Sequence, residues 1–200
     1  MDRFSFIRHF AAGRILDIGS GDRPIFADRG DVIEVDNLSY IFQPKAGYKP
    51  DGTKVIEDIG AWRENEVEKI KRVYKGRDFI IADGRHLPFP DESFDSVILG
   101  EVLEHVEEPK ELLKEAKRVL RPNGLIIGTC PNEYAWDRSL CPFEHSGHLH
   151  YFKEGDLRRL FREANLRLRL FYNTPPEWNF GFVFYYFILQ KVQKVEEAMS

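Results

Sequence analysis

Residues 14–24 read Arg-Ile-Leu-Asp-Ile-Gly-Ser-Gly-Asp-Arg-Pro, an apolar run that ends in a glycine turn. The apolar run is typical of a short β-strand covered on both faces. Gly19 and Gly21 permit the positive φ angles and the close backbone approach that a ligand-binding loop needs. Pro24 suits the first turn of a helix, and Asp17 lies where open α/β sheets bind their ligands. The stretch therefore predicts a strand, a ligand-binding loop and a helix start.

Strands and helices alternate along the rest of the chain. Further strands are expected at Val32–Asp36, Phe79–Asp83, Ser96–Gly100 and Leu125–Thr129, and helices at Trp62–Tyr74, Pro109–Leu120 and 153–165. Two closing strands, Leu166–Tyr172 and Phe180–Leu189, follow with no helix between them, so the last strand should be antiparallel. This order predicts an α/β, Rossmann-like fold whose mainly parallel sheet has helices on both faces. We expect one domain over residues 1–200, with its core at 14–190.

Three connections are less regular. Asn37–Gly60 is rich in proline and glycine, so we interpret it as a loop excursion. Pro122–Gly124 is a turn signal that should follow the helix ending at Leu120. Residues 19–31 are close to the minimum length for a connection between parallel strands, so the helix near Pro24 must be short.

The composition favours a soluble, cytoplasmic protein over a membrane or nucleic-acid-binding protein. The net charge is −4, which gives no basic field to attract nucleic acid. The two cysteines, Cys130 and Cys141, suit a reducing compartment better than a disulfide framework. Residues 1–12 lack the apolar core of a secretion signal, and the longest apolar run, 180–189, is too short to span a bilayer.

The glycine loop lacks the patterns of the common nucleotide-binding motifs. Pro24 stands where a dinucleotide fingerprint requires its third glycine, and no Gly-Lys-Ser/Thr of a phosphate-binding loop follows. Instead, three strands end in carboxylates: Asp17, Asp36 and Asp83. Asp36 can accept hydrogen bonds from both ribose hydroxyls, each worth about 1.5–3 kcal/mol, and Asp83 can accept one from an adenine amine. Acidic strand ends without a phosphate site favour S-adenosylmethionine over a dinucleotide.

Several motifs together resemble the class I S-adenosylmethionine-dependent methyltransferases, specifically the type 11, UbiE-like group. They are Asp17-Ile-Gly-Ser-Gly21, Val35-Asp36, Ala82–Asp95 with its Leu-Pro-Phe core, Glu101-Val-Leu-Glu-His-Val106 and Arg118–Gly124. The motifs follow one another in the family's order over residues 14–172. The resemblance implies a seven-stranded sheet with an antiparallel last strand.

The resemblance also implies a set of cofactor-binding residues. Gly19, Ser20 and Gly21 would contact the methionine portion, Asp36 the ribose, Asp83 the adenine, and Glu101 would lie beside the methionine end, with Asp17 acting through the loop backbone or a water. Arg23 stands where the family commonly has a glycine, and we hypothesise that it pairs with the methionine carboxylate. The full expected set is Asp17, Gly19, Ser20, Gly21, Arg23, Asp36, Asn37, Asp83, Gly84, Arg85 and Glu101.

Histidines are the candidates for the chemistry on the methyl acceptor. Transfer from a sulfonium needs alignment above all, with a base only if the nucleophile is a hydroxyl. His148 and His150, after the fifth strand, could be that base or orient the acceptor. His105 follows Glu101 at i+4, so the two would share a face if the segment is helical. Cys141, His145, His148 and His150 could be interpreted as metal ligands, but the alternation of His148 and His150 is untypical of a structural site, so we expect no metal.

The sequence predicts a methyltransferase that acts on an unidentified small molecule and releases S-adenosylhomocysteine. Two alternatives stay open: a cofactor-binding module without turnover, and an RNA-modifying methyltransferase. Cys130, after the fifth strand, is expected to be a small buried apolar residue. The aromatic run Phe180–Phe187 is expected in the core, although it could also form a homodimer patch.

Overall fold

The computed structural model describes residues 2–21, 24–26, 28–38, 46–48, 54–56, 59–135, 148–174 and 183–192. The strands are β1 (Ile15–Ile18), β2 (Val32–Asp36), β3 (Ala46–Tyr48), β4 (Lys54–Ile56), β5 (Asp78–Ile81), β6 (Phe94–Gly100), β7 (Leu120–Pro131), β8 (Leu166–Asn173) and β9 (Phe184–Lys191). The helices are α1 (Arg3–Phe10), α2 (Ile59–Val73), α3 (Pro109–Val119) and α4 (Glu154–Glu163), with 3-10 turns at Leu103–His105 and Glu133–Ala135.

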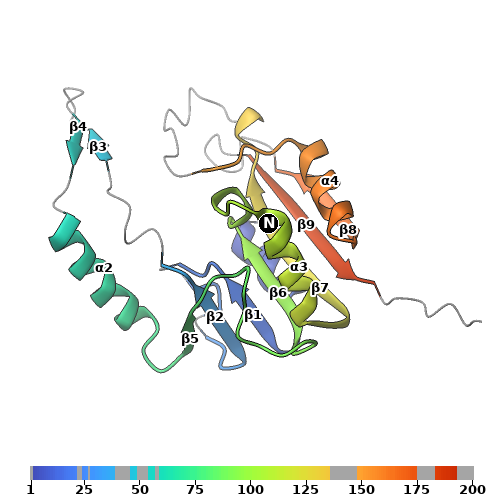
Figure 1. Ribbon diagram of the computed structural model, residues 1–200, viewed down its shortest axis with the longest axis horizontal. Helices are drawn as coiled ribbons and strands as arrows, with labels where there is room; N and C mark the ends of the chain where they lie inside the picture. Colours follow the sequence, from blue (N-terminus) through green and yellow to red (C-terminus); the bar gives the residue numbers. More distant parts are fainter. Residues whose placement is uncertain are drawn as a thin grey trace, which may run out of the picture.

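One seven-stranded sheet has the order β5-β2-β1-β6-β7-β9-β8 (Figure 1). Neighbouring strands in the series β5-β2-β1-β6-β7 pair in parallel, whereas β9 runs antiparallel to both β7 and β8. This arrangement confirms the predicted Rossmann-like fold and its antiparallel last strand. All the parallel strands end at the same edge of the sheet, where ligands of such folds bind.

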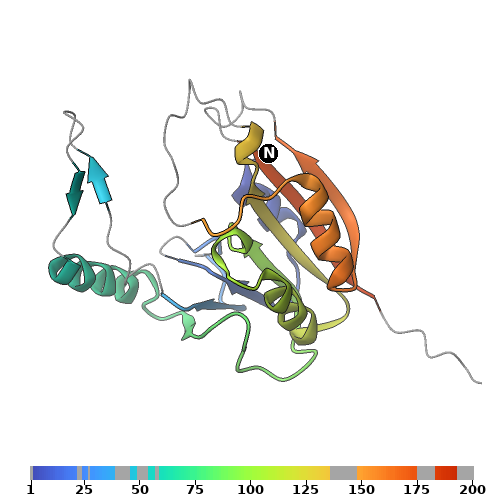
Figure 2. The same cartoon turned by 45° about the horizontal axis from the view of Figure 1, so that its top comes forward.

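Alternate residues of the buried strands fill two cores, one on each face of the sheet. On one face, α3 and α4 lie side by side and cover Leu16, Val97 and Leu99 (Figures 1 and 2). On the other face, α1 packs its Phe6 and Ile7 into the second core. The predicted helices on both faces are therefore present.

The helix α1 was not predicted, although its signals are local. The Asp2 carboxylate accepts a hydrogen bond from the Ser5 N–H at 3.0 Å, which caps the helix start. Phe6, Ile7 and Phe10 then supply an apolar stripe at helical spacing. The predicted short helix after the glycine loop is wrong for the residues seen there: 24–26 and 28–31 form turns. The connection from β1 to β2 is too short to add a helix, and α1 covers this face instead.

The interpretation of Asn37–Gly60 as a loop needs a correction. Within it, β3 and β4 form a separate antiparallel pair, with Ala46 opposite Ile56 and Tyr48 opposite Lys54. Two of the glycines that suggested a loop lie in regular structure, Gly47 within β3 and Gly60 within α2. α2 begins at Ile59, three residues before the predicted start.

Pro122–Gly124 also differs from its predicted role as a free turn. It lies within β7, which starts directly after α3. Asn123 has a φ of 65°, and the pairing with β6 shifts register between Leu120 and Leu125. The turn residues thus produce an irregularity inside a strand that continues on both sides.

The aromatic run lies in the core over its described residues. Phe184 to Leu189 are buried, and β9 has β7 on one side and β8 on the other. Both edges of β9 are paired and Phe184 to Leu189 are buried, so the homodimer contact through this strand stays a prediction that these residues do not support. No helix among the described residues has the length and apolar character needed to cross a membrane.

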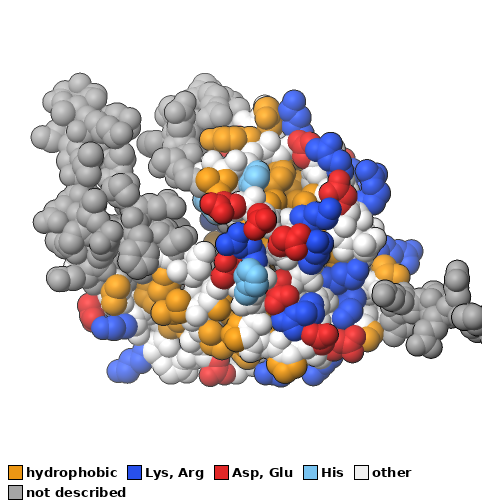
Figure 3. All heavy atoms as spheres, in the orientation of Figure 1, with side chains coloured by type: hydrophobic (Ala, Val, Ile, Leu, Met, Phe, Trp, Pro, Cys, Tyr) orange, Lys and Arg blue, Asp and Glu red, His pale blue; other side chains and the backbone are white. Residues whose placement is uncertain are grey.

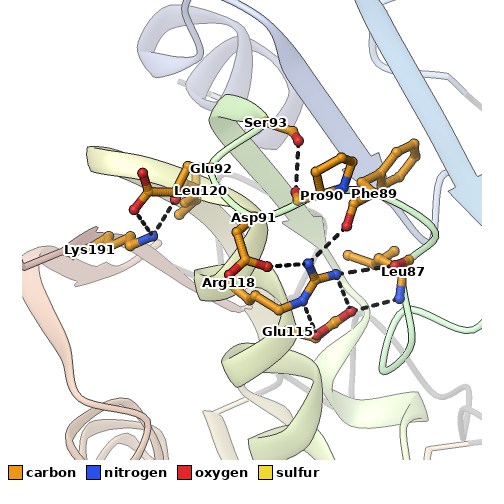
Figure 4. Close-up of polar contacts among 10 residues, drawn as sticks. All are labelled: Leu87, Phe89, Pro90, Asp91, Glu92, Ser93, Glu115, Arg118, Leu120 and Lys191. Carbon is orange, nitrogen blue, oxygen red and sulfur yellow. Dashed lines mark hydrogen bonds and ion pairs between the residues drawn. The ribbon is translucent and has the colours of Figure 1, made fainter.

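The Leu-Pro-Phe segment after β5 is held by α3 (Figure 4). The Arg118 guanidinium donates to the carbonyl oxygens of Phe89 at 2.8 Å and Leu87 at 3.2 Å. Its remaining hydrogen bonds go to the carboxylates of Asp91 and Glu115, and Glu115 accepts from the Leu87 N–H at 2.8 Å. Arg118 and Glu115 of α3 therefore hold the backbone of the Leu-Pro-Phe segment in place.

Candidate functional site

The glycine loop after β1 has the geometry that its sequence requires. Gly19 and Gly21 have φ angles of 72° and 59°. The Gly19 N–H donates to the Val35 carbonyl at 2.7 Å, which ties the loop to the end of β2. A Cβ on Gly19 would lie 2.5 Å from Val102, whereas a Cβ on Gly21 would meet nothing within 4 Å. The loop is therefore packed against the protein at Gly19 and open at Gly21.

Asp36 closes the loop from the tip of β2. Its carboxylate accepts hydrogen bonds from the Gly21 N–H at 2.8 Å and from the Leu38 N–H at 2.6 Å. Burial raises the pKa of the Asp36 carboxyl, and these two hydrogen bonds partly oppose the shift. Asn37, also in the predicted set, lies between Asp36 and Leu38. The structure thus brings the predicted ribose acceptor against the predicted methionine loop.

Tyr74, just beyond the last turn of α2, is a loop contact that the sequence analysis missed. Its hydroxyl donates to the Gly21 carbonyl at 2.7 Å and shares a second hydrogen bond with the Ser20 hydroxyl at 2.9 Å. The Tyr74 ring stacks on Phe79 of β5, with centroids 4.0 Å apart. Burial raises the pKa of the Tyr74 hydroxyl, so it stays a donor at neutral pH. No local spacing links Tyr74 to the loop, since the two are joined only by the tertiary fold.

Asp17 lies in the core beside a buried ion pair. It is 1% exposed and stands opposite Glu34 of β2 in the sheet register. Burial raises the pKa of Asp17 well above its usual range, and the charge of Glu34 raises it further. Arg77 forms an ion pair with Glu34 and lowers the pKa of Asp17. Asp17 is therefore buried at the strand end before the loop, and it does not face the open side directly.

Asp83, Gly84 and Arg85 form the turn that follows β5. The Arg85 guanidinium donates to the Asp83 carboxylate at 2.8 Å, and this contact lowers the pKa of Asp83. Arg85 also pairs with Glu108 at 3.1 Å. A Cβ on Gly84 would lie 2.7 Å from Leu112 and 2.8 Å from Ile18, so the turn fits closely between α3 and β1. Asp83 is ionised and partly exposed at the expected edge.

Glu101 ends β6 and pairs with a residue that the sequence analysis did not consider. Its carboxylate forms an ion pair with Arg3 of α1. Burial raises the pKa of Glu101, and Arg3 opposes the shift. Glu101 has a φ of 58°, and the helical turn begins only at Leu103, so the predicted shared helical face with His105 is wrong. The left-handed backbone at Glu101 separates strand from turn.

Two of the three candidate histidines come together. The rings of His105 and His148 pack edge to face, with centroids 4.7 Å apart. The Nδ1 atom of His148 hydrogen-bonds to the Glu133 carboxylate. His150 instead directs its Nε2 to the Val106 carbonyl at 2.9 Å and stacks on Phe152. His105 and His148 therefore share a site, while His150 holds the loop to the segment after β6.

Some predicted residues fall elsewhere. Arg23, Cys141 and His145 lie outside the described residues. Cys130 is fully buried at the end of β7, and burial raises the pKa of its thiol well above the usual range. The structure thus agrees with a structural role for Cys130.

The arrangement fits an adenosine-bearing sulfonium. The loop has an open side at Gly21, and Asp36, the predicted ribose acceptor, lies beside it. Acceptors dominate this edge, and the loop carries no lysine to hold a phosphate. The donor set suits hydroxyl and amine groups better than a pyrophosphate.

Comparison with known proteins also indicates a methyltransferase. The methyltransferase domain family matches residues 61–128. The ubiquinone/menaquinone biosynthesis C-methyltransferase UbiE of Desulfotalea psychrophila is 30% identical over 118 residues, covering 58% of this chain and 40% of that protein. The chain spans less than half the length of the curated relatives it matches first.

Solved structures share the fold across nearly the whole chain. An S-adenosylmethionine-dependent methyltransferase from Thermotoga maritima superposes with a TM-score of 0.63 at 18% identity, covering 94% of this chain and 87% of that one. The 1,6-didemethyltoxoflavin-N1-methyltransferase of Burkholderia thailandensis, solved with S-adenosylhomocysteine, gives 0.58 at 16% identity, covering 94% and 76%. The match of residues 61–128 to the methyltransferase domain family and the shared fold together support a class I S-adenosylmethionine-dependent methyltransferase.

Proposed function

We propose that this protein binds S-adenosylmethionine at the carboxyl edge of β1, β2, β5 and β6 and transfers its methyl group to a small molecule. The observation that carries the proposal is the meeting of the Gly19–Gly21 loop with Asp36. Asp83 follows β5 and Glu101 follows β6, two parallel strands that end at the same edge of the sheet with β2 and β1 between them. Four separate stretches of sequence would thus contribute to one binding site at this edge.

Each residue would have a distinct role in binding. Asp36 would accept hydrogen bonds from the ribose hydroxyls, and the Asp83 turn would receive the adenine. The backbone of Ser20 and Gly21 would border the methionine portion, and Tyr74 would hold that backbone in place. When bound, the sulfonium supplies a methyl group with a neutral thioether as leaving group. The protein therefore has to align the reactants and exclude water, and it needs no general acid.

The histidines lie on the acceptor side of this edge. His105 and His148 follow β6 and β7, next to Glu101. In this position they could orient an acceptor or take its proton. The alternation of positive and negative side chains over α3 and α4 in Figure 3 leaves no separate basic patch among the described residues of that face. That surface supports a small acceptor more than a nucleic acid, and the cysteine usage keeps the cytoplasm as the proposed compartment.

Calorimetry with S-adenosylhomocysteine tests the cofactor step directly. We expect saturable binding of one molecule per chain, weakened about tenfold to a hundredfold in Asp36→Asn, because asparagine keeps one acceptor oxygen and one charge-assisted hydrogen bond is lost. Asp28→Asn is the matched control: Asp28 is an exposed aspartate that pairs with Arg8 away from the loop. Equal binding by Asp36→Asn and wild type, or preferential binding of a dinucleotide, would refute the assignment.

Turnover is a separate measurement. Release of S-adenosylhomocysteine on adding candidate acceptors, among them phenols, amines and sugars, would establish methyl transfer. Tight cofactor binding with no release for any acceptor would favour the alternative of a binding module.

A further inference from the structure

A group of three potential metal ligands lies between the ends of β6 and β7. It consists of Glu104, His105 and His148, each with one ligand atom, and these atoms lie within 4.8 Å of one another. Ligands around one transition ion with bonds of about 2.0–2.2 Å are at most about 4.3 Å apart. Because ligand atoms at tetrahedral or cis positions lie about 3.0–3.6 Å apart, a contraction of at most about 1–2 Å brings all three onto one ion.

The Glu104 carboxylate gives an independent indication that something is bound there. The residue is 1% exposed, and neither carboxylate oxygen has a hydrogen bond among the described residues. The nearby Cys130 thiol is at most a weak donor. A buried carboxylate without a strong partner is costly to maintain, whereas a cation would compensate it.

The surroundings of the cluster resemble the outer shell of a metal site. Glu133 holds the His148 ring through Nδ1, in the way that carboxylates commonly orient metal-binding imidazoles. Glu101 and Glu133 both lie close enough to act on the charge of Glu104. Three carboxylates therefore gather around two imidazoles, which makes the position attractive to a cation. The exposed His105 leaves the cluster accessible from solvent.

We propose that Glu104, His105 and His148 bind a divalent first-row transition ion such as Mn²⁺, Fe²⁺, Co²⁺ or Zn²⁺. Two imidazoles and a carboxylate form a mixed nitrogen and oxygen set that suits these ions better than Ca²⁺. Three protein ligands leave open positions on the ion. This proposal differs from the expectation from sequence that no metal is bound, because its ligands come from two separate segments and His150 is not among them.

The position of the ion gives it a chemical consequence. It would lie beside Glu101, on the acceptor side of the proposed methyl donor. An acceptor hydroxyl bound to the ion would ionise more readily and would be held in one orientation. That consequence rests on the proposed function, whereas the binding of the ion does not.

Titration of the full chain with Co²⁺, after treatment with a chelator, tests the proposal. We expect one equivalent to bind with visible d–d absorption, and Zn²⁺ to displace it. Glu104→Gln and His148→Asn should each weaken Co²⁺ binding at least tenfold, and Glu133→Gln about tenfold to a hundredfold through loss of ring orientation. His86→Ala, an exposed histidine in the turn after β5, should bind as wild type does.

Two outcomes would overturn the proposal. One is the absence of Co²⁺ and Zn²⁺ binding by folded wild type, and the other is unchanged affinity in Glu104→Gln, which would mean that Glu104 is simply a buried neutral acid. Far-ultraviolet circular dichroism of each variant shows whether it is folded, and Glu104→Gln keeps the side-chain shape. Calorimetry with S-adenosylhomocysteine in excess chelator separates the two proposals, because the cofactor site can be intact while the metal site is not.

Discussion

The ion pair between Arg77 and Glu34 offers the sharpest test of how the core beneath the cofactor loop is stabilised. Glu34 is fully buried in β2, and the Arg77 side chain is 13% exposed. Arg77 donates to both carboxylate oxygens of Glu34 and to the Phe26 carbonyl at 3.2 Å. Asp17 stands next to Glu34 in the sheet, so a second carboxyl shares the same surroundings.

Arg77→Met removes the cation and leaves the Glu34 carboxylate buried. Breaking one side of such a pair costs about 3–5 kcal/mol of the free energy of unfolding. For a protein of this size, that corresponds to a fall in Tm of roughly 6–20 °C. The double variant Glu34→Leu with Arg77→Met should recover most of this loss, because it leaves no uncompensated charge and keeps the volume.

Urea unfolding at pH 7, followed by circular dichroism, gives the free energies. Lys71→Met is the control: its ion pair with Glu68 has both side chains about two-thirds exposed, so the cost should be under about 1 kcal/mol. A loss below about 1 kcal/mol in Arg77→Met, or a double variant no more stable than the single one, would refute the reasoning.

Three further predictions concern the loop and the surface. Gly19→Ala should lower both the free energy of unfolding and the affinity for S-adenosylhomocysteine, because alanine is strained by about 1–2 kcal/mol at φ 72° and its Cβ would meet Val102. Gly30→Ala is the control: a Cβ there meets nothing within 4 Å, so neither quantity should change in the same assays. Tyr74→Phe should cost about 1–2 kcal/mol in urea unfolding and weaken cofactor binding, since Gly21 and Ser20 each lose a hydrogen bond; unchanged values would remove Tyr74 from the site. The Arg8 guanidinium lowers the pKa of Asp28 to about 2. This pair therefore stabilises the fold fully above the ordinary pKa of 3.8 and loses its effect as the pH falls through about 2. Nuclear magnetic resonance titration should show the Asp28 midpoint near 2, and in Arg8→Gln the midpoint should return towards 3.8.

The sequence alone was sufficient for the seven strands of the main sheet and for the glycines and carboxylates at their ends. Buried strands have short apolar runs, and the loop and strand ends carry their glycines and carboxylates at fixed places relative to those runs. Asp36 was predicted from its position at the end of a strand, and the structure places it against Gly21. The helix α1 was also readable, because its cap and apolar stripe are local, but it was not recognised.

Other features were decided only by the tertiary structure. Arg3 reaches Glu101, Tyr74 reaches the glycine loop, and His148 reaches His105 across distances along the chain that no spacing rule covers. The sequence analysis paired His148 with its neighbour His150, but in a strand-to-helix loop adjacent histidines need not face the same way. Packing of β6 beside β7 brings the turn after one strand to the loop after the other. The burial of the Glu104 carboxylate could not be predicted from the sequence, because desolvation depends on what surrounds a side chain in space and not on its neighbours in the chain.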